Sequence, residues 1–269
     1  MAKGRQAAGR SGRERGRGAR GGPGGEERLW LFGIHAVRDA LLNPRRRRFR
    51  LVVTRNAAQR LAEAIAASGM EPEIVEPRRF PVPLDPGSVH QGAALEVAPL
   101  EWGEPGTVCA PEGPADRVVA LDRVTDPHNV GAVLRSAEVF GARAVIAPRR
   151  HAAPETGALA KAASGALERQ PYLRVRNLAE ALGELKALGY AVIGLDGEAP
   201  LELAEALEPP RPVVLVLGAE GPGMRQRTRE SCDLLARIPA ARDFGSLNVS
   251  NAAAVALYAA MMAARRAGG

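Results

Sequence analysis

The second half of the chain alternates short apolar runs with amphipathic stretches, and this pattern constrains the fold more than any other feature. The apolar runs are Val118–Leu121, Ala144–Ala147, Tyr172–Val175, Ala191–Leu195, Val213–Leu217 and Leu235–Ile238. Runs of this kind are typical of parallel strands buried on both faces, and the stretches between them are typical of helices that cover those faces. We therefore predict an α/β domain with a parallel sheet over residues 117–269.

A smaller unit precedes this domain at residues 28–98. Apolar residues at helical spacing over 31–41 predict a short helix, and a second helix is expected around 59–67. Strands are predicted at Leu51–Thr54, near Ile74 and at Ala93–Val97. Residues 99–116 contain four prolines and three glycines, a composition that resists both helix and sheet, so we predict an interdomain linker there.

Positive charge is concentrated in two places. Residues 1–25 hold seven basic residues against one glutamate, which accounts for +6 of the net charge of +7. Residues 1–27 have almost no apolar side chains, so we expect this tail to be disordered. A second basic run comprises Arg45, Arg46, Arg47, Arg48 and Arg50. Segregated positive charge indicates contact with a phosphate backbone, although short arginine runs are often merely solvated.

Several classes of protein are disfavoured. No apolar run approaches the roughly 20 residues that cross a bilayer, and the charged N-terminus lacks the apolar stretch of a secretory signal, so we expect a cytoplasmic protein. Cys109 and Cys232 lie far apart and show no zinc or disulfide spacing. The four histidines show no metal-ligand spacing either, so no metal site is expected.

Three loops that follow predicted strands carry the candidate chemistry, because ligands of an open parallel sheet bind at the carboxyl ends of its strands. The first loop runs from Asp122 to Asn129 and leads into a predicted helix. Asn129 is placed to cap that helix, so a plain N-cap and a functional role both stay open. Arg135 falls off the apolar stripe of the same helix, a position that by itself favours a solvated arginine.

The second loop, 218–223, has three glycines that would let a ligand approach the backbone closely. It lacks the Lys-Ser/Thr ending of a phosphate-binding loop, and the dinucleotide fingerprint is poorly met. Glu220 would repel a phosphate but suits a ligand with hydroxyls or an amine. A turn glutamate without a functional role is the alternative.

The third loop, 244–251, leads into an Ala-rich helix that ends in two arginines. Four polar side chains crowd this helix entrance: Ser246, Asn248, Ser250 and Asn251. A cap needs only one or two of them, so the excess favours a functional role.

In this order and spacing the three loops resemble the motifs of the SpoU-type RNA ribose 2′-O-methyltransferases of the SPOUT superfamily. The motifs are 125–131 with Arg135, 217–224 and 246–250, and the resemblance covers residues 117–266. It implies an α/β parallel sheet with a C-terminal trefoil knot and a homodimer with RNA spanning the two subunits. It further implies methyl transfer from S-adenosylmethionine to a ribose 2′-hydroxyl.

The resemblance also implies roles for individual residues. The implied catalytic set is Asn129, Arg135, Glu220, Ser246 and Asn248. The implied cofactor-binding residues are Leu217, Gly218, Glu220, Gly221, Ile238 and Leu247. The family proposal makes the motif arginine a general base, but a guanidinium pKa lies above about 12, so a bidentate grip on the adjacent phosphate is the alternative.

The small unit narrows the implied substrate. Its segments Gly33–Val37 and His90–Gly92 are similar to the ribosomal-protein-like RNA-binding domain that precedes the catalytic domain in large-subunit rRNA guanosine methylases. The implied substrate is a guanosine of 23S rRNA in the peptidyl-transferase region, with the arginine run at 45–50 in contact with RNA. The sequence departs from the family pattern directly after Pro239. The family usually has Met and Gly there, at the edge of the cofactor pocket, whereas residues 240–245 of this chain read Ala-Ala-Arg-Asp-Phe-Gly.

Two other functions stay open. A ribosome-assembly factor that only holds RNA would keep the arginine run but would not need Glu220 or the Ser246 and Asn248 pair. A resistance-type methylase that acts on another rRNA nucleotide would share every catalytic motif. Only the small unit can distinguish the resistance-type methylase from the guanosine methylase.

Overall fold

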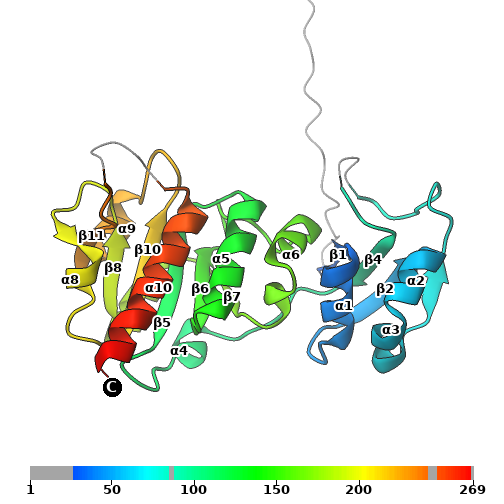
Figure 1. Ribbon diagram of the computed structural model, residues 1–269, viewed down its shortest axis with the longest axis horizontal. Coiled ribbons are helices and arrows are strands. Elements are labelled where there is room, and N and C mark those ends of the chain that lie inside the picture. The colour runs from blue at the N-terminus through cyan, green and yellow to red at the C-terminus, as the bar shows by residue number, and fades with distance from the viewer. Residues whose placement is uncertain (1–26, 85–87, 242–246, 268–269) are drawn as a thin grey trace, which may run out of the picture.

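The computed structural model describes residues 27–84, 88–241 and 247–267, and it contains two sheets that lie side by side along the long axis of the molecule (Figure 1). The predicted disordered tail lies almost wholly outside the described residues. Among the helices that the structure describes, none combines the length and apolar character that a membrane crossing requires.

The small sheet has four strands in the order β1-β4-β2-β3. Its strands are β1 (Leu29–Phe32), β2 (Arg48–Val53), β3 (Pro72–Ile74) and β4 (Ala93–Val97), and its helices are α1 (Ile34–Leu42), α2 (Arg55–Arg60) and α3 (Ala62–Ser68). The predicted strands are confirmed, but Leu31, assigned to a helix, lies in β1 opposite Leu95. The helix begins only after Gly33, whose φ of 90° interrupts the helical spacing.

The large sheet has seven strands in the order β7-β6-β5-β10-β8-β11-β9, and every pairing is parallel. The strands are β5 (Arg117–Asp122), β6 (Ala144–Pro148), β7 (Tyr172–Val175), β8 (Ala191–Leu195), β9 (Leu201–Glu202), β10 (Val213–Gly218) and β11 (Leu234–Arg237). All six predicted strands are confirmed. The two-residue β9 was missed because it is too short to show a period.

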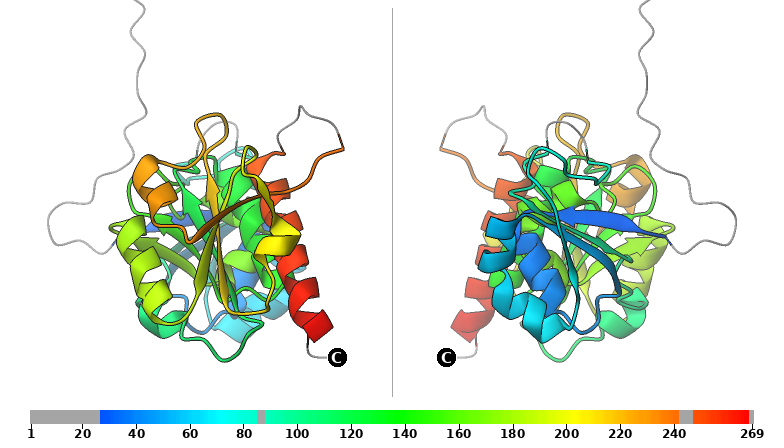
Figure 2. Two further views of the ribbon diagram at one scale, coloured as in Figure 1. Left: turned by 90° about the vertical axis from the view of Figure 1, so that its left-hand side faces the viewer. Right: turned by 90° about the vertical axis from the view of Figure 1, so that its right-hand side faces the viewer.

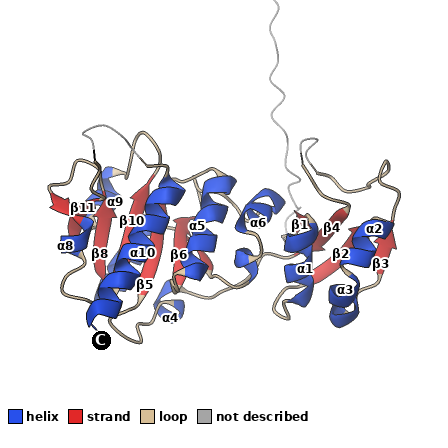
Figure 3. Cartoon of the chain, in the orientation of Figure 1, coloured by secondary structure: helices blue, strands red, loops and turns tan. Residues whose placement is uncertain are grey.

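Helices cover both faces of this sheet, as the left-hand view of Figure 2 shows. One layer contains α5 (Pro127–Val139), α6 (Gly157–Ala163), α8 (Leu203–Ala206) and α10 (Val249–Ala267); the other contains α4 (Pro105–Val108), α7 (Leu178–Ala187) and α9 (Gln226–Glu230). Figure 3 shows α5 and α10 crossing one face together. The single turn α4 corrects the prediction that 99–116 forms no helix, since Pro105 occupies the first helical position, where its missing N–H is not needed.

Close contact between α5 and α6 depends on Gly131. A Cβ atom at this position would lie 2.5 Å from the Cβ of Ala162 and 2.8 Å from the backbone nitrogen of Ala163. The two helices therefore approach so closely that only glycine fits without movement of the backbone.

We predict that Gly131→Ala lowers the free energy of unfolding by about 1–3 kcal/mol, because the added methyl overpacks this helix contact. Gly183→Ala in α7 is the matched control, since nothing lies within 4 Å of its added Cβ, and it should stabilise the fold by about 0.5–1 kcal/mol. Urea denaturation measures both, and equal stabilisation by the two variants would contradict the helix contact.

Candidate active site

The first two candidate loops emerge side by side because β5 and β10 are adjacent parallel strands. Their register pairs Leu121 with Leu217 and Asp122 with Gly218, so both strands end at the same level. The chain after β5 continues into α5, and the chain after β10 forms a glycine-rich turn closed by two hydrogen bonds between Ala219 and Gly223. The carboxyl edge of the sheet therefore presents both loops together.

A polar ring forms where these loops meet the start of α10. The Nδ2 of Asn129 donates to Oε1 of Glu220 at 3.3 Å. The Nδ2 of Asn248 donates to the same oxygen at 2.6 Å and to Oδ1 of Asn129 at 2.9 Å. Three side chains from segments up to 119 residues apart thus close a ring of hydrogen bonds, which we call the polar ring.

Glu220 is the hub of the polar ring. Its Oε1 also lies 3.4 Å from the backbone nitrogen of Val249, which donates to it from the first turn of α10. Its Oε2 accepts no hydrogen bond from any residue that the structure describes. One carboxylate oxygen therefore holds the ring together, while the other is available to a ligand that can donate a hydrogen bond.

Asn129 is not the N-cap of its helix. Asp126 caps α5, because its side chain accepts a hydrogen bond from the backbone nitrogen of His128 at 3.0 Å. The capping alternative for Asn129 is therefore wrong, and its amide is free to face Glu220.

Asn248 serves the helix entrance and the polar ring together. Its Oδ1 accepts from the backbone nitrogen of Ser250 at 2.9 Å and from the Ser250 hydroxyl at 2.6 Å, which satisfies an otherwise unpaired N–H of α10. Its Nδ2 is thereby aimed at Glu220. Ser246 lies outside the described residues.

Asp122 fixes the glycine-rich turn and was not singled out from the sequence. It is fully buried at the end of β5 and accepts from the backbone nitrogen and the Nε of Arg225, each at 2.8 Å. The ion pair fastens the far end of the turn that carries Glu220 to the neighbouring strand. An acidic residue directly after a run of apolar residues was the signal that could have identified it.

Arg135 does not join the polar ring within one chain. It follows Asn129 by six residues on α5, which places it about 9 Å further along the axis and roughly 240° around it. Its side chain is exposed, and no hydrogen bond or ion pair joins it to another of the described residues.

Comparisons with known proteins identify the family to which the chain is similar. The SpoU rRNA Methylase family matches residues 116–258, and the family described as RNA 2′-O ribose methyltransferase substrate binding matches residues 30–103. A 23S rRNA (guanosine-2′-O-)-methyltransferase RlmB of Pseudomonas syringae pv. tomato is 40% identical over 238 residues, covering 86% of this chain and 94% of the relative. The chain belongs to the SpoU rRNA methylase family. A second RlmB, of Salmonella typhi, is 38% identical over 239 residues, or 86% of this SpoU methylase and 97% of the relative.

Solved structures of the family share the fold. The SpoU methyltransferase AviRb from Streptomyces viridochromogenes, in complex with the cofactor AdoMet, aligns with a TM-score of 0.75 and 23% identity, covering 90% of this chain and 92% of that one. A TrmH-family structure from Porphyromonas gingivalis aligns with a TM-score of 0.67 and 28% identity, covering 86% and 88%. The predicted α/β SPOUT fold is confirmed.

In this SpoU methylase, most of the residues that the resemblance implies for cofactor binding lie at or just after the ends of β10 and β11. Leu217 and Gly218 end β10, and Gly221 lies exposed in the turn that follows. Ile238 follows β11 and is half-buried, whereas Leu247 is 49% exposed before α10. Leu217, Gly218 and Gly221 thus lie on the segment that carries Glu220, and Leu247 directly precedes Asn248.

The arginine run divides into two groups. Arg46 is 2% exposed and bonded to Glu155 and Glu168 of the large domain, so the prediction that it contacts RNA is corrected. The other four are partly or wholly exposed: Arg45, Arg47, Arg48 and Arg50. Three of these guanidiniums lie over aromatic rings, namely Arg45 over Trp102, Arg47 over Phe49 and Arg50 over Trp30.

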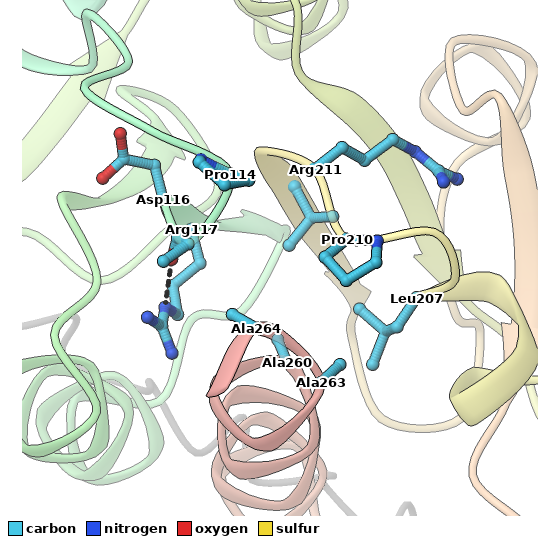
Figure 4. Close-up of a pocket in the computed structure, with 11 residues that line it drawn as sticks. Pro114, Asp116, Arg117, Leu207, Pro210, Arg211, Ala260, Ala263 and Ala264 are labelled. Carbon is cyan, nitrogen blue, oxygen red and sulfur yellow. Dashed lines mark hydrogen bonds between the residues drawn. The ribbon is translucent and has the colours of Figure 1, made fainter. Parts of the chain in front are cut away.

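A cavity at the opposite edge of the sheet is not this site (Figure 4). It is lined by Arg117 and Val213, which begin β5 and β10, and ligands of parallel sheets bind at the other end. Burial lowers the pKa of Arg117, whose Nε donates to the carbonyl of Ala115 at 3.0 Å. Within the described ranges, no group of three His, Cys, Asp or Glu residues is placed to hold a metal ion.

We predict that Asn248→Asp lowers methyl transfer by at least about 100-fold at neutral pH, because it removes the donor to Glu220 and places a second carboxylate beside it. Asn251→Asp is the matched control, since Asn251 is exposed one residue beyond Ser250 and has no hydrogen bond to the polar ring. Steady-state transfer of labelled methyl measures both variants. Equal activity of the two would show that the polar ring is not needed.

Proposed function

We propose that this SpoU methylase transfers a methyl group from S-adenosylmethionine to the ribose 2′-hydroxyl of a guanosine in 23S rRNA. The observation that carries the proposal is the polar ring, which brings Asn129, Glu220 and Asn248 together at the carboxyl edge of the sheet. The RlmB relatives named above support the substrate, since they align over nearly their whole length. Because ribosomal RNA is the substrate, we place the protein in the cytoplasm.

The residues at this edge fit S-adenosylmethionine. Ile238 and the exposed Leu247 offer an apolar surface to an adenine ring, and the backbone of Gly218 and Gly221 offers hydrogen-bonding groups without a side chain in the way. The carboxylate of Glu220 suits a cationic ligand. When bound, S-adenosylmethionine supplies a methyl group on a positively charged sulfur.

The chain must then align a ribose oxygen with that methyl and stabilise the charge that develops. Oε2 of Glu220 takes no part in the hydrogen bonds of the polar ring, so we assign it the hydrogen bond from the 2′-hydroxyl or from the cofactor amine. Asn129 has one Nδ2 hydrogen beyond the bond it gives Glu220, and we assign it to the substrate ribose. Ser246 keeps its implied role in orienting the hydroxyl.

We propose that Arg135 grips the phosphate next to the target ribose. Its exposed position beyond the polar ring suits a phosphate better than a proton transfer, because a guanidinium is not deprotonated in proteins. A bidentate grip needs the planar fork that only arginine provides.

We therefore predict that Arg135→Lys lowers kcat/KM for rRNA by about tenfold, since it keeps the charge but loses one of two parallel hydrogen bonds. Arg135→Ala should lose considerably more. Kinetics at varied RNA concentration distinguish binding from turnover. Nearly full turnover of the lysine variant with unchanged RNA affinity would refute a special role for the guanidinium.

We propose that two copies associate through the face formed by α5 and α10. Large apolar side chains are exposed there: Val139 is 74% exposed, Tyr258 51% and Val255 42%. Phe140 and Tyr258 form an edge-to-face pair with ring centroids 6.0 Å apart, which makes the patch continuous across the two helices. A cluster of exposed large apolar side chains on two adjacent helices indicates an interface. The trefoil knot is part of the same family expectation.

Tyr258→Glu is predicted to yield a monomer, because it places a charge in the centre of that face. Tyr258→Phe keeps the ring and should remain a dimer. Light scattering coupled to size exclusion reports the mass directly, and a monomeric parent protein would overturn the proposed homodimer.

RNA contact is assigned to the exposed arginines of the small domain. Arg45 and Arg47 lie over Trp102 and Phe49, and guanidinium planes beside aromatic rings are suited to nucleobases and phosphates together. Each of these arginines also has a protein partner: Arg45 donates to the carbonyl of Glu101 at 2.8 Å, Arg48 donates to the carbonyl of Leu41, and Arg50 pairs with Glu73 at 2.8 Å.

The test is transfer of labelled methyl from S-adenosylmethionine to unmodified 23S rRNA, followed by mapping of the protected 2′-hydroxyl. We expect a single modified guanosine in the peptidyl-transferase region. Transfer to another nucleotide would favour the resistance-type methylase, and no transfer to any rRNA would favour the assembly factor. Asn248→Asp is the inactive control for contaminating activity.

A further inference from the structure

Arg46 is the centre of a buried ion network that joins the two domains. Its Nε and Nη2 donate to the two oxygens of Glu168, at 3.0 and 2.6 Å. Its Nη1 donates to Glu155 at 2.6 Å and to the carbonyl of Ala98 at 2.8 Å. Burial lowers the pKa of Arg46, but the hydrogen bonds and charges of Glu168 and Glu155 reverse this and raise it, so the guanidinium stays charged.

Neighbouring groups complete this network, which we call the Arg46 network (Arg46, Glu155 and Glu168). Asn43 donates to Oε2 of Glu168 at 2.8 Å and to its carbonyl at 3.1 Å. The backbone nitrogen of Leu100 donates to Glu155 at 3.4 Å. Both carboxylates therefore have partners from the small domain and the chain that follows it, and neither charge is left unpaired in the interior.

Close packing reinforces the same interface. A Cβ at Gly157, in the first turn of α6, would collide with the ring of Phe32 and the carbonyl of Trp30 in β1. Apolar residues of both domains belong to one continuous buried cluster, which contains Leu31 and Val37 on one side and Leu159 and Leu167 on the other. An interface that is both apolar and closed by bidentate charge pairs holds one orientation.

Residues 75–84 and 88–92, which lie between β3 and β4, carry side chains that are suited to RNA. Arg78 and Arg79 are exposed, and the rings of Phe80 and His90 stack with centroids 4.1 Å apart. In Figure 1 this segment lies at the same upper edge of the molecule as the loop after β10 that carries Glu220. A change in domain orientation would alter the span between them.

We propose that Arg46 is a positioning residue: its network holds the RNA-contacting segment of residues 75–84 and 88–92 at a fixed span from the polar ring, and this span determines which nucleotide reaches the ring. The inference rests on the proposed function. Arg46 touches neither substrate nor cofactor and acts through the domain orientation. When the domains are locked in the orientation that binds RNA, no part of the population occupies other domain orientations, and the apparent affinity for RNA is not reduced.

The test compares two ways of releasing the interface. The triple variant Arg46→Met, Glu155→Gln and Glu168→Gln removes all three charges together, so that no buried charge is stranded. Gly157→Val keeps all three residues of the Arg46 network and opens the interface by steric pressure, since it drives α6 away from β1. The matched controls are the exposed triple Arg60→Met, Glu63→Gln and Glu184→Gln, and Gly183→Val, where nothing lies within 4 Å of the added Cβ.

Hydrogen exchange of the full-length protein reports the interface without reference to activity. We expect exchange of the amides of residues 43–48 and 153–169 to become at least about tenfold faster in both released variants and to stay unchanged in both controls. The rest of the large domain should keep its protection, which shows that the variants fold. Unchanged exchange at the interface in the charge-removed variant would overturn the proposal.

Kinetics and mapping then test the consequence. If the released domains spend a tenth of the time in the locked orientation, KM for intact 23S rRNA rises about tenfold while kcat at saturating RNA changes little. Secondary methylated nucleotides should appear beside the principal one. Faster exchange at the interface combined with an unchanged KM and a single methylated nucleotide would overturn the positioning role. If the parent protein methylates no rRNA, the proposed function is overturned, while the exchange result on the interface still stands.

Discussion

Parallel pairing between β5 and β10 is the contact on which the site depends. These strands are separated by some ninety residues of sequence, yet their register brings Leu121 beside Leu217 and Asp122 beside Gly218. The buried carboxylate of Asp122 then fixes Arg225 at the far end of the glycine-rich turn, so the position of Glu220 is determined from both ends of that turn. Asn129 and Asn248 reach Glu220 because α5 and α10 start at the same edge. The groups that must be aligned are thereby held by a turn that is fixed at both ends and by the entrances of two helices.

Much of this fold could be predicted from the sequence. Strands buried on both faces leave an unmistakable run of apolar residues, and the six such runs beyond residue 117 all became strands. Short elements could not be found in this way. β1 was merged with the following helix, β9 has only two residues, and α4 was hidden in a segment rich in proline and glycine. None of these is long enough to establish a period of its own.

The site was predictable in outline and less so in detail. Polar side chains at three strand ends indicated a shared site, and the structure joins Asn129, Glu220 and Asn248 as expected. Position along a helix could not distinguish a cap from a functional amide, and Asp126 rather than Asn129 proved to be the cap. The arginine run misled for a different reason. Five neighbouring arginines look alike in sequence, but only the acidic residues at 155 and 168, brought close by the tertiary fold, reveal that Arg46 turns inward.

The central mechanistic claim is that Asn129 and Asn248 act as a unit through their hydrogen bonds to Glu220 in the polar ring. A double-mutant cycle with Asn129→Ala, Asn248→Ala and the double variant, measured as kcat/KM for rRNA, tests this claim directly. If the ring is one device, the double variant loses little more activity than the more damaged single variant. If the two single losses multiply in the double variant, as they do for independent sites, the two amides work separately. The hydrogen bonds of the polar ring would then not couple them in catalysis.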